Sequence, residues 1–548
     1  MEVFDYIIVG AGTAGCVLAS RLVASGRRRV LLLEAGGSDR RLWIRVPIGY
    51  GRTFSDPRVN WMYATEPEPA LLGRRVFWPR GKVLGGSGSI NGMVYVRGLP
   101  HDFDDWQALG NPGWGYREVL PYFRRLEDYP GAPDEYHARG GPISITDVSG
   151  AAHPLCRTFI DSCMRLGYPQ LADLNGARTE GVSIYQITTR NGLRASTATG
   201  YLRPALRQRN LTLRLRAQAL RILFHSQRAI GIAYRQRAHT HQARASQGLI
   251  LCLGAVNTPQ LLQLSGVGDT GLLRRHGIEV VAHHPQVGLN LQDHLDFSYG
   301  YRARVPTLND EIHPWRGKLT AAVRYALTRG GPLSMSINQS GGFIRSDADR
   351  PRPNMQLYFS PLSYPAARWP VRRLLQPDPF SGLVLSFNPC RPTSRGRIEI
   401  RSADPLAAPL IFANYLSTEH DLAEALAGVR RLRSIAATAP LADVIAAQLE
   451  PAATGSSDAA LLQEFRTRAT TCFHPVGSCR MGPDAAAAVV DARLRVHGLS
   501  ALWVVDASIF PTVTSGNTNT PTIMVAEKAA EMIREEEGDG VSWARQPG

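Results

Sequence analysis

A glycine-rich turn near the start of the chain sets the strongest limit on its fold. The apolar run VFDYIIV is typical of a strand, GAGTAG follows it, a helical pattern continues to about residue 24, and a second strand, RVLLLE, ends at Glu34. The glycines of the turn are Gly10, Gly12 and Gly15. In such a unit they permit a tight turn, close approach of a pyrophosphate and packing of the helix on the sheet. Glu34, 19 residues after the last glycine, would accept hydrogen bonds from a ribose and disfavours NADP. We therefore predict a dinucleotide site in a Rossmann-like α/β fold, with a purely structural turn as the alternative and with NAD and FAD both open.

The composition is that of an ordinary globular protein, with 44% hydrophobic and 20% charged residues in a chain of 548. No stretch approaches the roughly 18 consecutive apolar residues of a membrane-spanning helix, and the first residues show no basic, cleavable leader. Seven cysteines, an odd number and thinly scattered, predict free thiols. We expect a cytoplasmic protein.

The net charge of +16 raises the question of an anionic partner. However, the chain has only the lysines Lys82, Lys318 and Lys528, and its arginines are spread in short groups. This distribution predicts a solvated basic surface and no nucleic-acid partner. Loose peripheral attachment to the inner face of an anionic membrane is the alternative.

Two further stretches are typical of ligand-binding loops. GKVLGGSGSINGMVYVRG at 81–98 places glycine and serine in a loop whose backbone can lie against a flat or anionic ligand. GAVNTPQLLQLSGVG at 254–268 follows the strand GLILCLG. It predicts a turn capped by Thr258, with Pro259 at the first position of a short helix.

A third stretch, TCFHPVGSCRMG at 471–482, sets His474 between Cys472 and Cys479. Zinc is disfavoured, because this cluster lacks a fourth ligand and no second pair lies at suitable spacing. The cysteines are then predicted to be packing residues and no metal is expected. On the residues alone, His474 is either a buried core histidine or a catalytic base.

Together these stretches resemble the glucose-methanol-choline (GMC) oxidoreductases, a family of FAD enzymes. Further stretches that carry the resemblance, in family order, are VGLNLQDH at 287–294, HPVGSCRMG at 474–482, VVDASIFP at 504–511 and GNTNTPTIMVAEK at 516–528. Through FWPRGKVLGG and NGMVYVRG the chain is most similar to the choline-dehydrogenase-like and aliphatic-alcohol-dehydrogenase-like branch.

The resemblance implies an FAD-binding domain of Rossmann-like α/β type, assembled from separated segments, and a second substrate domain built on an antiparallel sheet (α+β). We place the FAD-binding domain at 1–150, 205–295 and 465–535, and the substrate-binding domain at 151–204 and 296–464. RGRIEIRS is expected to be a strand and LAEALAGVRRLRSIAA a helix. Residues 536–548 are expected to form a loose tail.

The resemblance also implies which residues bind the cofactor. Besides Gly10, Gly12, Gly15 and Glu34, they are Thr13, Ala14, Ala35, Trp61, Arg80, Gly81, Leu84, Gly85, Ser87, Asn91, Gly92, Met93, Val94, Ala219, Asp506, Ala507, Asn517, Thr518 and Pro521. Asp506 has a structural alternative as a turn acid. Relatives that attach the flavin covalently use a His just before the motif Asn, where this chain has Ile90. We therefore predict non-covalent FAD.

By the same resemblance, His474 and Asn517 are the catalytic pair at the reactive edge of the flavin. His474 would remove the hydroxyl proton of an alcohol while hydride passes to flavin N5. Asn517 would hydrogen-bond the developing alkoxide. For Asn517 the alternative is a turn residue in the Gly-Asn-Thr-Asn run.

The resemblance indicates a primary alcohol as substrate. Choline-oxidising relatives commonly show a Glu where NQSGGF offers Gln339, which disfavours choline and leaves an aliphatic or arylic alcohol as the preferred class. Met335 and Tyr358 are further pocket candidates. The expected electron acceptor is a quinone or carrier protein, with O2 as the alternative, and the oligomeric state is not predicted. A hydroxynitrile lyase or photodecarboxylase of the same fold is the rival function.

Overall fold

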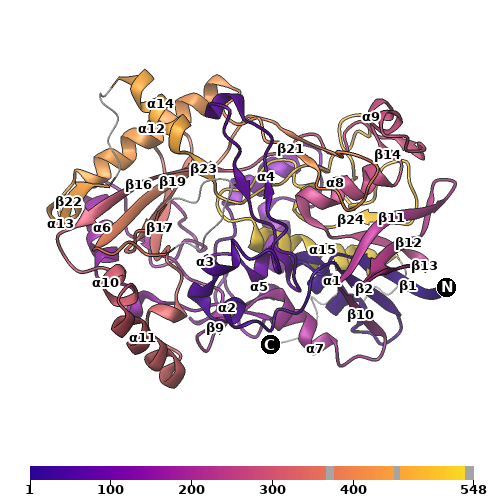
Figure 1. Cartoon of the computed structure of the whole chain (residues 1–548), viewed down its shortest axis with the longest axis horizontal. Helices are drawn as coiled ribbons and strands as arrows, with labels where there is room; N and C mark the ends of the chain where they lie inside the picture. The colour runs from indigo at the N-terminus through magenta and orange to yellow at the C-terminus, as the bar shows by residue number, and fades with distance from the viewer. Residues whose placement is uncertain (366–375, 450–456, 537–548) are drawn as a thin grey trace.

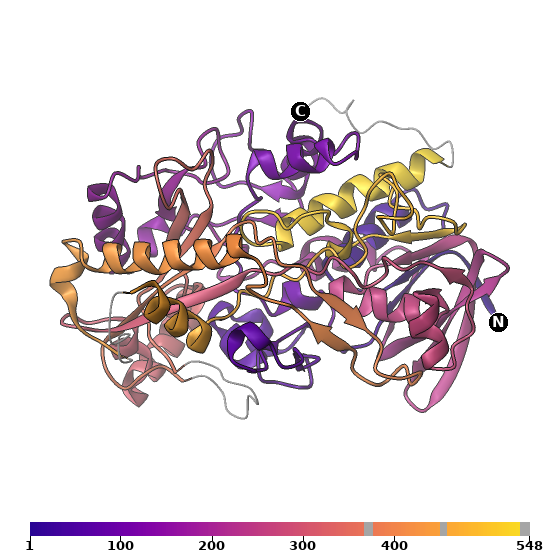
Figure 2. The same cartoon turned by 90° about the horizontal axis from the view of Figure 1, so that it is seen from above.

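Two sheets lie side by side along the long axis of the molecule (Figures 1 and 2). The computed structural model describes residues 1–365, 376–449 and 457–536. The first sheet lies on the right of Figure 1 and the second on the left. This arrangement agrees with the predicted fold class, a Rossmann-like α/β unit beside a unit built on an antiparallel sheet.

The first sheet has seven strands in the order β10-β2-β1-β13-β12-β11, with β24 paired to β13. Pairings among β10, β2, β1, β13 and β24 are parallel, whereas β11, β12 and β13 form an antiparallel meander. Its strands are β1 (Glu2–Val9), β2 (Val30–Glu34), β10 (Leu211–Leu215), β11 (Ala217–His225), β12 (Arg228–Gln236), β13 (His239–Leu251) and β24 (Leu502–Val504).

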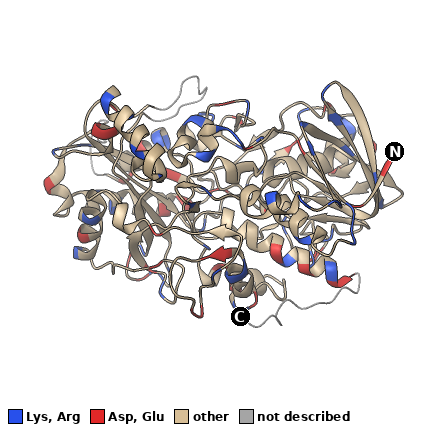
Figure 3. Ribbon diagram, turned by 90° about the horizontal axis from the view of Figure 1, so that it is seen from below, with Lys and Arg blue, Asp and Glu red and all other residues tan. Residues whose placement is uncertain are grey.

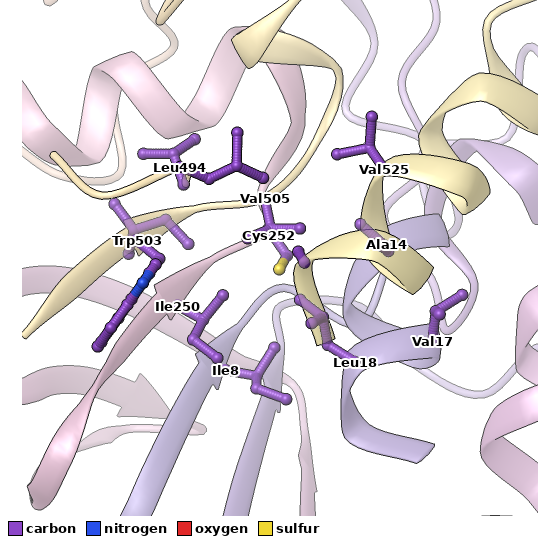
Figure 4. Close-up of a cluster of buried hydrophobic side chains, with 14 of the residues drawn as sticks. Ile8, Ala14, Val17, Leu18, Ile250, Cys252, Leu494, Trp503, Val505 and Val525 are labelled. Carbon is purple, nitrogen blue, oxygen red and sulfur yellow. The ribbon is translucent and has the colours of Figure 1, made fainter. Parts of the chain in front are cut away.

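The core of this unit lies between the parallel strands and two helices, α1 (Thr13–Val23) and α15 (Asn519–Glu536). Ile8 and Ile250 from the sheet meet Ala14 and Leu18 of α1 and Val525 of α15 (Figure 4). The end of β1 and all of β2 are buried, and for this reason their sequences are nearly continuous apolar runs. Helix α15 thus brings the end of the described chain against its beginning.

The second sheet is antiparallel throughout, in the order β22-β16-β19-β18-β17-β7, with β23 paired to β16. Its strands are β7 (Gly181–Ile184), β16 (Leu295–Ala303), β17 (Ser340–Ile344), β18 (Met355–Ser360), β19 (Gly382–Pro389), β22 (Ile445–Gln448) and β23 (Thr470–Thr471). Helix α12 (Glu419–Ala436) packs on β19, and it covers the stretch predicted to be helical.

The remaining elements are short strands and helices around these two units. The strands are β3 (Tyr63–Ala64), β4 (Phe77–Trp78), β5 (Glu127–Asp128), β6 (Ile143–Ser144), β8 (Thr189–Arg190), β9 (Leu193–Arg194), β14 (Val267–Gly268), β15 (Ala282–His283), β20 (Arg397–Glu399) and β21 (Leu410–Phe412). The helices are α2 (Leu42–Arg45), α3 (Tyr50–Thr53), α4 (Pro100–Ala108), α5 (Tyr116–Leu126), α6 (Leu155–Arg165), α7 (Arg203–Ala205), α8 (Gly254–Leu264), α9 (Thr270–Arg275), α10 (Leu308–Ile312), α11 (Trp315–Thr328), α13 (Leu441–Val444) and α14 (Asp458–Arg468).

Helix α8 corrects one prediction. It begins at Gly254, so Thr258 and Pro259 lie inside it and do not mark its start. Thr258 Oγ1 donates to Asp506 Oδ2 at 2.6 Å, and the Gly254 N–H donates to the same oxygen at 2.9 Å. Pro259 has no N–H for the carbonyl four residues earlier. Ser478 Oγ supplies that hydrogen bond instead, donating to the Ala255 carbonyl at 2.6 Å.

The predicted domain ranges can be compared with the two sheets. The strands of the first sheet lie within the ranges assigned to the FAD-binding domain, and β7 and β16–β19 lie at or within those of the substrate domain. β23, however, falls in the range 465–535 but pairs with β16 of the second sheet. The exact ranges stay a prediction, and 537–548 of the expected tail lie outside the described residues.

Charge and hydropathy add two observations. Lys and Arg are scattered over the ribbon and interspersed with Asp and Glu (Figure 3). Within residues 1–365, 376–449 and 457–536, no helix is long and apolar enough to cross a membrane.

The contact between α12 and β19 leaves no space at Gly428. A Cβ there would lie 1.8 Å from Cε2 of Phe387, a ring that is fully buried. We expect Gly428→Ala to lower the free energy of unfolding by about 1–3 kcal/mol, because overpacking outweighs the helix propensity of alanine. Thermal and urea unfolding measure it, with Gly150→Ala, where a Cβ meets nothing within 4 Å, as the control. Equal stability of the two variants would contradict the packing described.

Candidate active site

A large cavity runs between the two sheets. Its volume is about 920 Å³, and its lining extends from Gly10 and Glu34 of the first unit to Asp296 and Tyr358 of the second. His474 and Asn517 line it as well. This volume is near the upper end for small-molecule sites, roughly 300–1,000 Å³.

The glycine turn forms one end of the cavity. Gly10 has φ +100, and a Cβ there would lie 2.5 Å from the Cys252 carbonyl oxygen. A Cβ on Gly15 would lie 1.9 Å from the Gly10 carbonyl oxygen, so α1 can pack here only because this residue is glycine. Gly12, Thr13 and Ala14, at the start of α1, line the cavity. Their N–H groups belong to the first turn of a helix, which leaves such donors without intrahelical partners.

Glu34 lies at the end of β2 beside this turn. Its Oε2 accepts a hydrogen bond from the Ala11 N–H at 3.0 Å and its Oε1 accepts one from the Gly36 N–H at 2.7 Å. Burial raises the pKa of Glu34 to about 7. Each carboxylate oxygen has a second lone pair for a ribose hydroxyl.

The loop from Gly81 to Val94 lies directly against the turn. A Cβ on Gly81 would lie 2.2 Å from the backbone of Gly86, and one on Gly86 would lie 2.7 Å from Cα of Gly12. Arg194 holds this loop: its Nη1 donates to Asn91 Oδ1 at 2.6 Å, and burial lowers its pKa to about 9. Sequence reasoning missed Arg194, which lies outside every motif.

Most of the predicted cofactor residues line the cavity. They are Gly10, Gly12, Thr13, Ala14, Glu34, Ala35, Trp61, Arg80, Gly81, Ser87, Asn91, Gly92, Met93, Val94, Ala219, Asp506, Ala507, Asn517 and Thr518. Gly15, Leu84, Gly85 and Pro521 are not part of the lining. They have structural contacts instead: the Gly85 N–H donates to the Ala11 carbonyl at 2.7 Å, and Pro521 is buried in α15.

His474 is fixed through its backbone. Its N–H donates to Asp293 Oδ1 at 2.8 Å, and Thr471 Oγ1 donates to Asp293 Oδ2 at 2.5 Å. The Tyr415 hydroxyl donates to the same carboxylate. Burial raises the pKa of Asp293 to about 6. Asp293 is part of VGLNLQDH, so this motif positions the histidine.

The side chain of His474 has a partner on each nitrogen. Its Nδ1 lies 3.0 Å from Nδ1 of His294, and its Nε2 accepts a hydrogen bond from Asn517 Nδ2 at 3.0 Å. His294 Nε2 lies 2.9 Å from the Cys390 carbonyl, which can only accept. Neutral His294 therefore carries its proton on Nε2 and accepts at Nδ1. It follows that His474 carries its proton on Nδ1 and that its Nε2, at the cavity, is unprotonated and accepts from Asn517.

Both histidines are neutral near pH 7. Burial, the neighbouring His294 and the Arg80 charge hold the pKa of His474 well below its usual value. Burial also lowers the pKa of His294 to about 4. His474 is thus available as a proton acceptor.

Asn517 is oriented by a short chain of hydrogen bonds. The Tyr358 hydroxyl donates to Gln356 Oε1 at 2.7 Å, and Gln356 Nε2 donates to Asn517 Oδ1 at 3.4 Å. The amide nitrogen of Asn517 is thereby turned towards His474. Gln356 was missed by sequence reasoning, since nothing in NMQLYFS marks it.

Of the three pocket candidates, Tyr358 lines the cavity, but Met335 and Gln339 do not. Met335 is buried in a small cluster with Tyr50 and Met93. Gln339 Oε1 accepts a hydrogen bond from the His153 N–H at 2.8 Å. Its neighbours Ile337 and Asn338 line the cavity instead.

The cavity wall from the second sheet contains a carboxylate that sequence reasoning missed. Asp296 lines the cavity with Tyr364 and Ser386. It accepts a hydrogen bond from Ser298 Oγ at 3.0 Å, and burial raises its pKa to about 7. No ion-pair partner for Asp296 occurs in the described part of the chain. Its position, two residues after VGLNLQDH, is the only signal that could have found it.

These features fit FAD. The turn and the loop meet where no side chain could be accommodated, amide donors and Glu34 lie at one end, and the paired His474 and Asn517 lie in the same cavity. Such a site can hold an extended dinucleotide with its reactive ring beside a base.

The comparisons with known proteins agree with this site. Two family models described as GMC oxidoreductase match residues 4–296 and 392–526. An oxygen-dependent choline dehydrogenase from Vibrio vulnificus (strain YJ016) is 42% identical over 97% of this chain and 94% of its own length. An alcohol dehydrogenase [acceptor] from Pseudomonas putida is 41% identical over 97% of this chain and 95% of its own.

Solved structures show the same fold. Pyridoxine 4-oxidase from Mesorbium loti has a TM-score of 0.87 at 30% identity and covers 97% of this chain and 99% of its own. Formate oxidase has a TM-score of 0.91 at 26% identity and covers 98% of this chain and 99% of its own. The chain therefore belongs to the GMC oxidoreductase family of FAD-dependent enzymes.

Proposed function

We propose that this protein oxidises a primary alcohol to the aldehyde and passes the electrons to a quinone-type or other acceptor. The observation that supports this most directly is the unprotonated Nε2 of His474, paired with Asn517 Nδ2 at 3.0 Å in the cavity that fits FAD, where a substrate hydroxyl can take the place of the Asn517 hydrogen bond. The relatives named alcohol dehydrogenase and choline dehydrogenase agree with the reaction class.

His474 has the role of base. Its Nε2 accepts the hydroxyl proton of the alcohol, and the resulting imidazolium keeps its Nδ1 hydrogen bond to His294. FAD, held by the glycine turn and the 81–94 loop, supplies the acceptor for the two electrons. Loss of the hydroxyl proton makes the carbon-bound hydride easier to release.

Asn517 has the role of orienting group. Its Nδ2 carries two protons, of which one points to His474 Nε2, and the amide can donate to the substrate oxygen on which negative charge develops; Gln356 holds its carbonyl oxygen. Ile90, where covalently flavinylated relatives have a histidine, supports dissociable FAD.

A primary aliphatic or arylic alcohol is the substrate class that we propose first. A second candidate, an alcohol with a cationic group such as choline, is favoured by the half-buried carboxylate of Asp296 near Tyr358 and Tyr364. A carboxylate beside aromatic rings suits a cation. Anaerobic reduction of the flavin by a panel of alcohols, repeated with Asp296→Asn, distinguishes the two substrate classes. If the variant loses flavin reduction by choline but keeps it with uncharged alcohols, the cationic substrate is favoured.

Replacing His474 tests the reaction class. We expect His474→Ala to lower the rate constant of anaerobic flavin reduction by roughly 10²–10⁴-fold, with FAD still bound. Asn517→Ala should lower it by roughly 10²-fold. Stopped-flow absorbance of the flavin measures both, and His420→Ala, which replaces an exposed histidine of α12, is the control. A flavoprotein that no alcohol reduces would contradict the proposal and favour the lyase or photodecarboxylase.

The low pKa of His474 sets the pH dependence. Its neutral form is the base, so the limiting rate constant of flavin reduction should be constant above pH 6.5, the ordinary histidine value, and fall only at lower pH. The limiting rate constant is measured because Asp296, with a pKa near 7, acts on substrate binding. A rate that rises as the pH falls would exclude neutral His474 as the base.

His294 sets the tautomer of His474 and is a positioning residue. His294→Leu removes the acceptor for the Nδ1 proton, so we expect a loss of roughly 10-fold or more in the limiting rate. His294→Gln offers an oxygen to His474 and an N–H to Cys390, and should restore part of it. ¹⁵N NMR of the ring nitrogens reports the tautomer directly. Equal losses in both variants, with the tautomer unchanged, would mean that His294 only fills space.

The choice of electron acceptor is a separate test. We expect the reduced enzyme to react faster with a quinone analogue than with oxygen, as proposed for a dehydrogenase. Oxygen consumption and quinone reduction are followed on the same preparation. Faster oxygen consumption would assign the protein as an oxidase.

A further inference from the structure

Helix α11 exposes an apolar stripe that the proposed reaction does not use. Trp315, Leu319, Val323 and Leu327 recur at every fourth position, with exposed fractions of 70%, 57%, 49% and 80%. Residues four apart lie on one face of a helix. Such a run is unusual, because large apolar side chains on a soluble surface normally occur singly.

The opposite face of α11 attaches it to the protein. Ala321 and Tyr325 are its buried residues, and the Tyr325 hydroxyl donates to the Gly192 carbonyl at 2.7 Å. The helix also packs on α10 and on the short turn at Pro332–Ser334. Helix α11 projects at the lower left of Figure 1. Nothing in residues 1–365, 376–449 or 457–536 covers the stripe.

The charges on α11 itself have one sign, whereas α10, which packs on it, carries Asp310 and Glu311. No acidic residue occurs between Glu311 and Asp347, whereas Arg316, Lys318, Arg324 and Arg329 fall within this interval. Arg316 lies over the Trp315 ring, 5.4 Å from its centroid, so one cation is at the stripe itself. None of the four has an acidic partner in the described structure.

A second exposed apolar pair lies close to α11. Leu42 and Trp43 of α2 have exposed fractions of 65% and 37%, and Arg52 lies over the Trp43 ring at 4.1 Å. Helix α2 packs on β9, and the Gly192 carbonyl that Tyr325 of α11 contacts directly precedes this strand, so the two helices are near each other. This pair adds apolar and basic groups beside α11.

We propose that α11 docks the protein on a bilayer surface that contains anionic phospholipid. An amphipathic helix with basic residues, a tryptophan and exposed aliphatic side chains lies in the plane of such an interface, with its apolar face among the acyl chains. The basic residues are attracted to the anionic headgroups. The occupant is a lipid surface because α11 combines exposed apolar side chains with cations and carries no acidic residue.

The position of α11 gives this docking a consequence. The turn at Pro332–Ser334 packs both on α11 and on Pro47–Gly49, and the next residue, Tyr50, lines the cavity. We therefore expect a protein held through α11 to have its cavity close to the membrane, where apolar alcohols and quinones accumulate. The docking itself does not depend on the proposed reaction, and its test needs no substrate.

The test is co-sedimentation of the full chain with vesicles. We expect binding to vesicles of phosphatidylcholine with about 30% phosphatidylglycerol, and at least roughly 10-fold weaker binding to phosphatidylcholine alone. Leu319→Ser/Val323→Ser/Leu327→Ser should lose binding by roughly 10-fold or more. Leu72→Ser/Leu109→Ser/Leu406→Ser removes three exposed leucines elsewhere and should bind like the parent.

A second pair of variants tests the charge. Arg316→Gln/Lys318→Gln/Arg324→Gln should lower binding to anionic vesicles, whereas Arg207→Gln/Arg209→Gln/Arg237→Gln, with the same change in net charge, should bind like the parent. Retained flavin confirms that each variant is folded. Equal effects of both triple changes would overturn the proposal in favour of unspecific attraction by net charge.

Sedimentation velocity tests the remaining possible occupant of the stripe, a second copy of this chain. If the serine variant of α11 turns a dimer into a monomer and vesicle binding is unchanged, the stripe is an interface with a second copy and the lipid proposal is wrong. Absence of vesicle binding by the parent at low salt would overturn it as well.

Discussion

The site depends on the contact of three backbone segments, two of which have glycine at the point of contact. The turn at Gly10 and Gly12, the loop at Gly81 and Gly86, and the end of β13 approach so closely that a Cβ at several of these positions would fall within 3 Å of another backbone. Glycine is required here for space as much as for its conformational freedom. The cavity, the donors at the start of α1 and the path from Glu34 to His474 all follow from this contact.

At the other end of the cavity, a network of hydrogen bonds between buried polar groups holds the catalytic candidates in position. Asp293 fixes the backbone of His474, and His294 and Asn517 fix its ring. Buried hydrogen bonds of this kind are costly to leave incomplete, so the network defines one arrangement of the base. Because burial keeps both histidines uncharged, the site can take a proton without first having to lose one.

The sequence was sufficient for the parts of the structure that rest on local pattern. The spacing of apolar residues and the sequence motifs predict the strand–turn–helix unit, the helix α12 and the family. The position of α8 was predicted wrongly, because Ser478 satisfies the carbonyl that Pro259 leaves free, and that hydrogen bond joins residues 223 positions apart. The wrong prediction for Gln339 and the failure to predict Asp296 have a similar cause. Which side chain of a strand faces a cavity depends on how the strands pair in the sheet, and the sequence of one protein alone does not reveal that pairing.

The first sheet is completed by segments from the end of the chain. β24 pairs with β13, and α15 packs on α1. A growing polypeptide therefore carries an unfinished apolar sheet until β24 and α15 have been made, about 470 residues after the strand–turn–helix unit at 2–34. This unit lacks part of its sheet and core until then. Insertion of the flavin is expected to wait for the same residues, and a message truncated before α15 would yield a chain that exposes this sheet to aggregation and proteolysis.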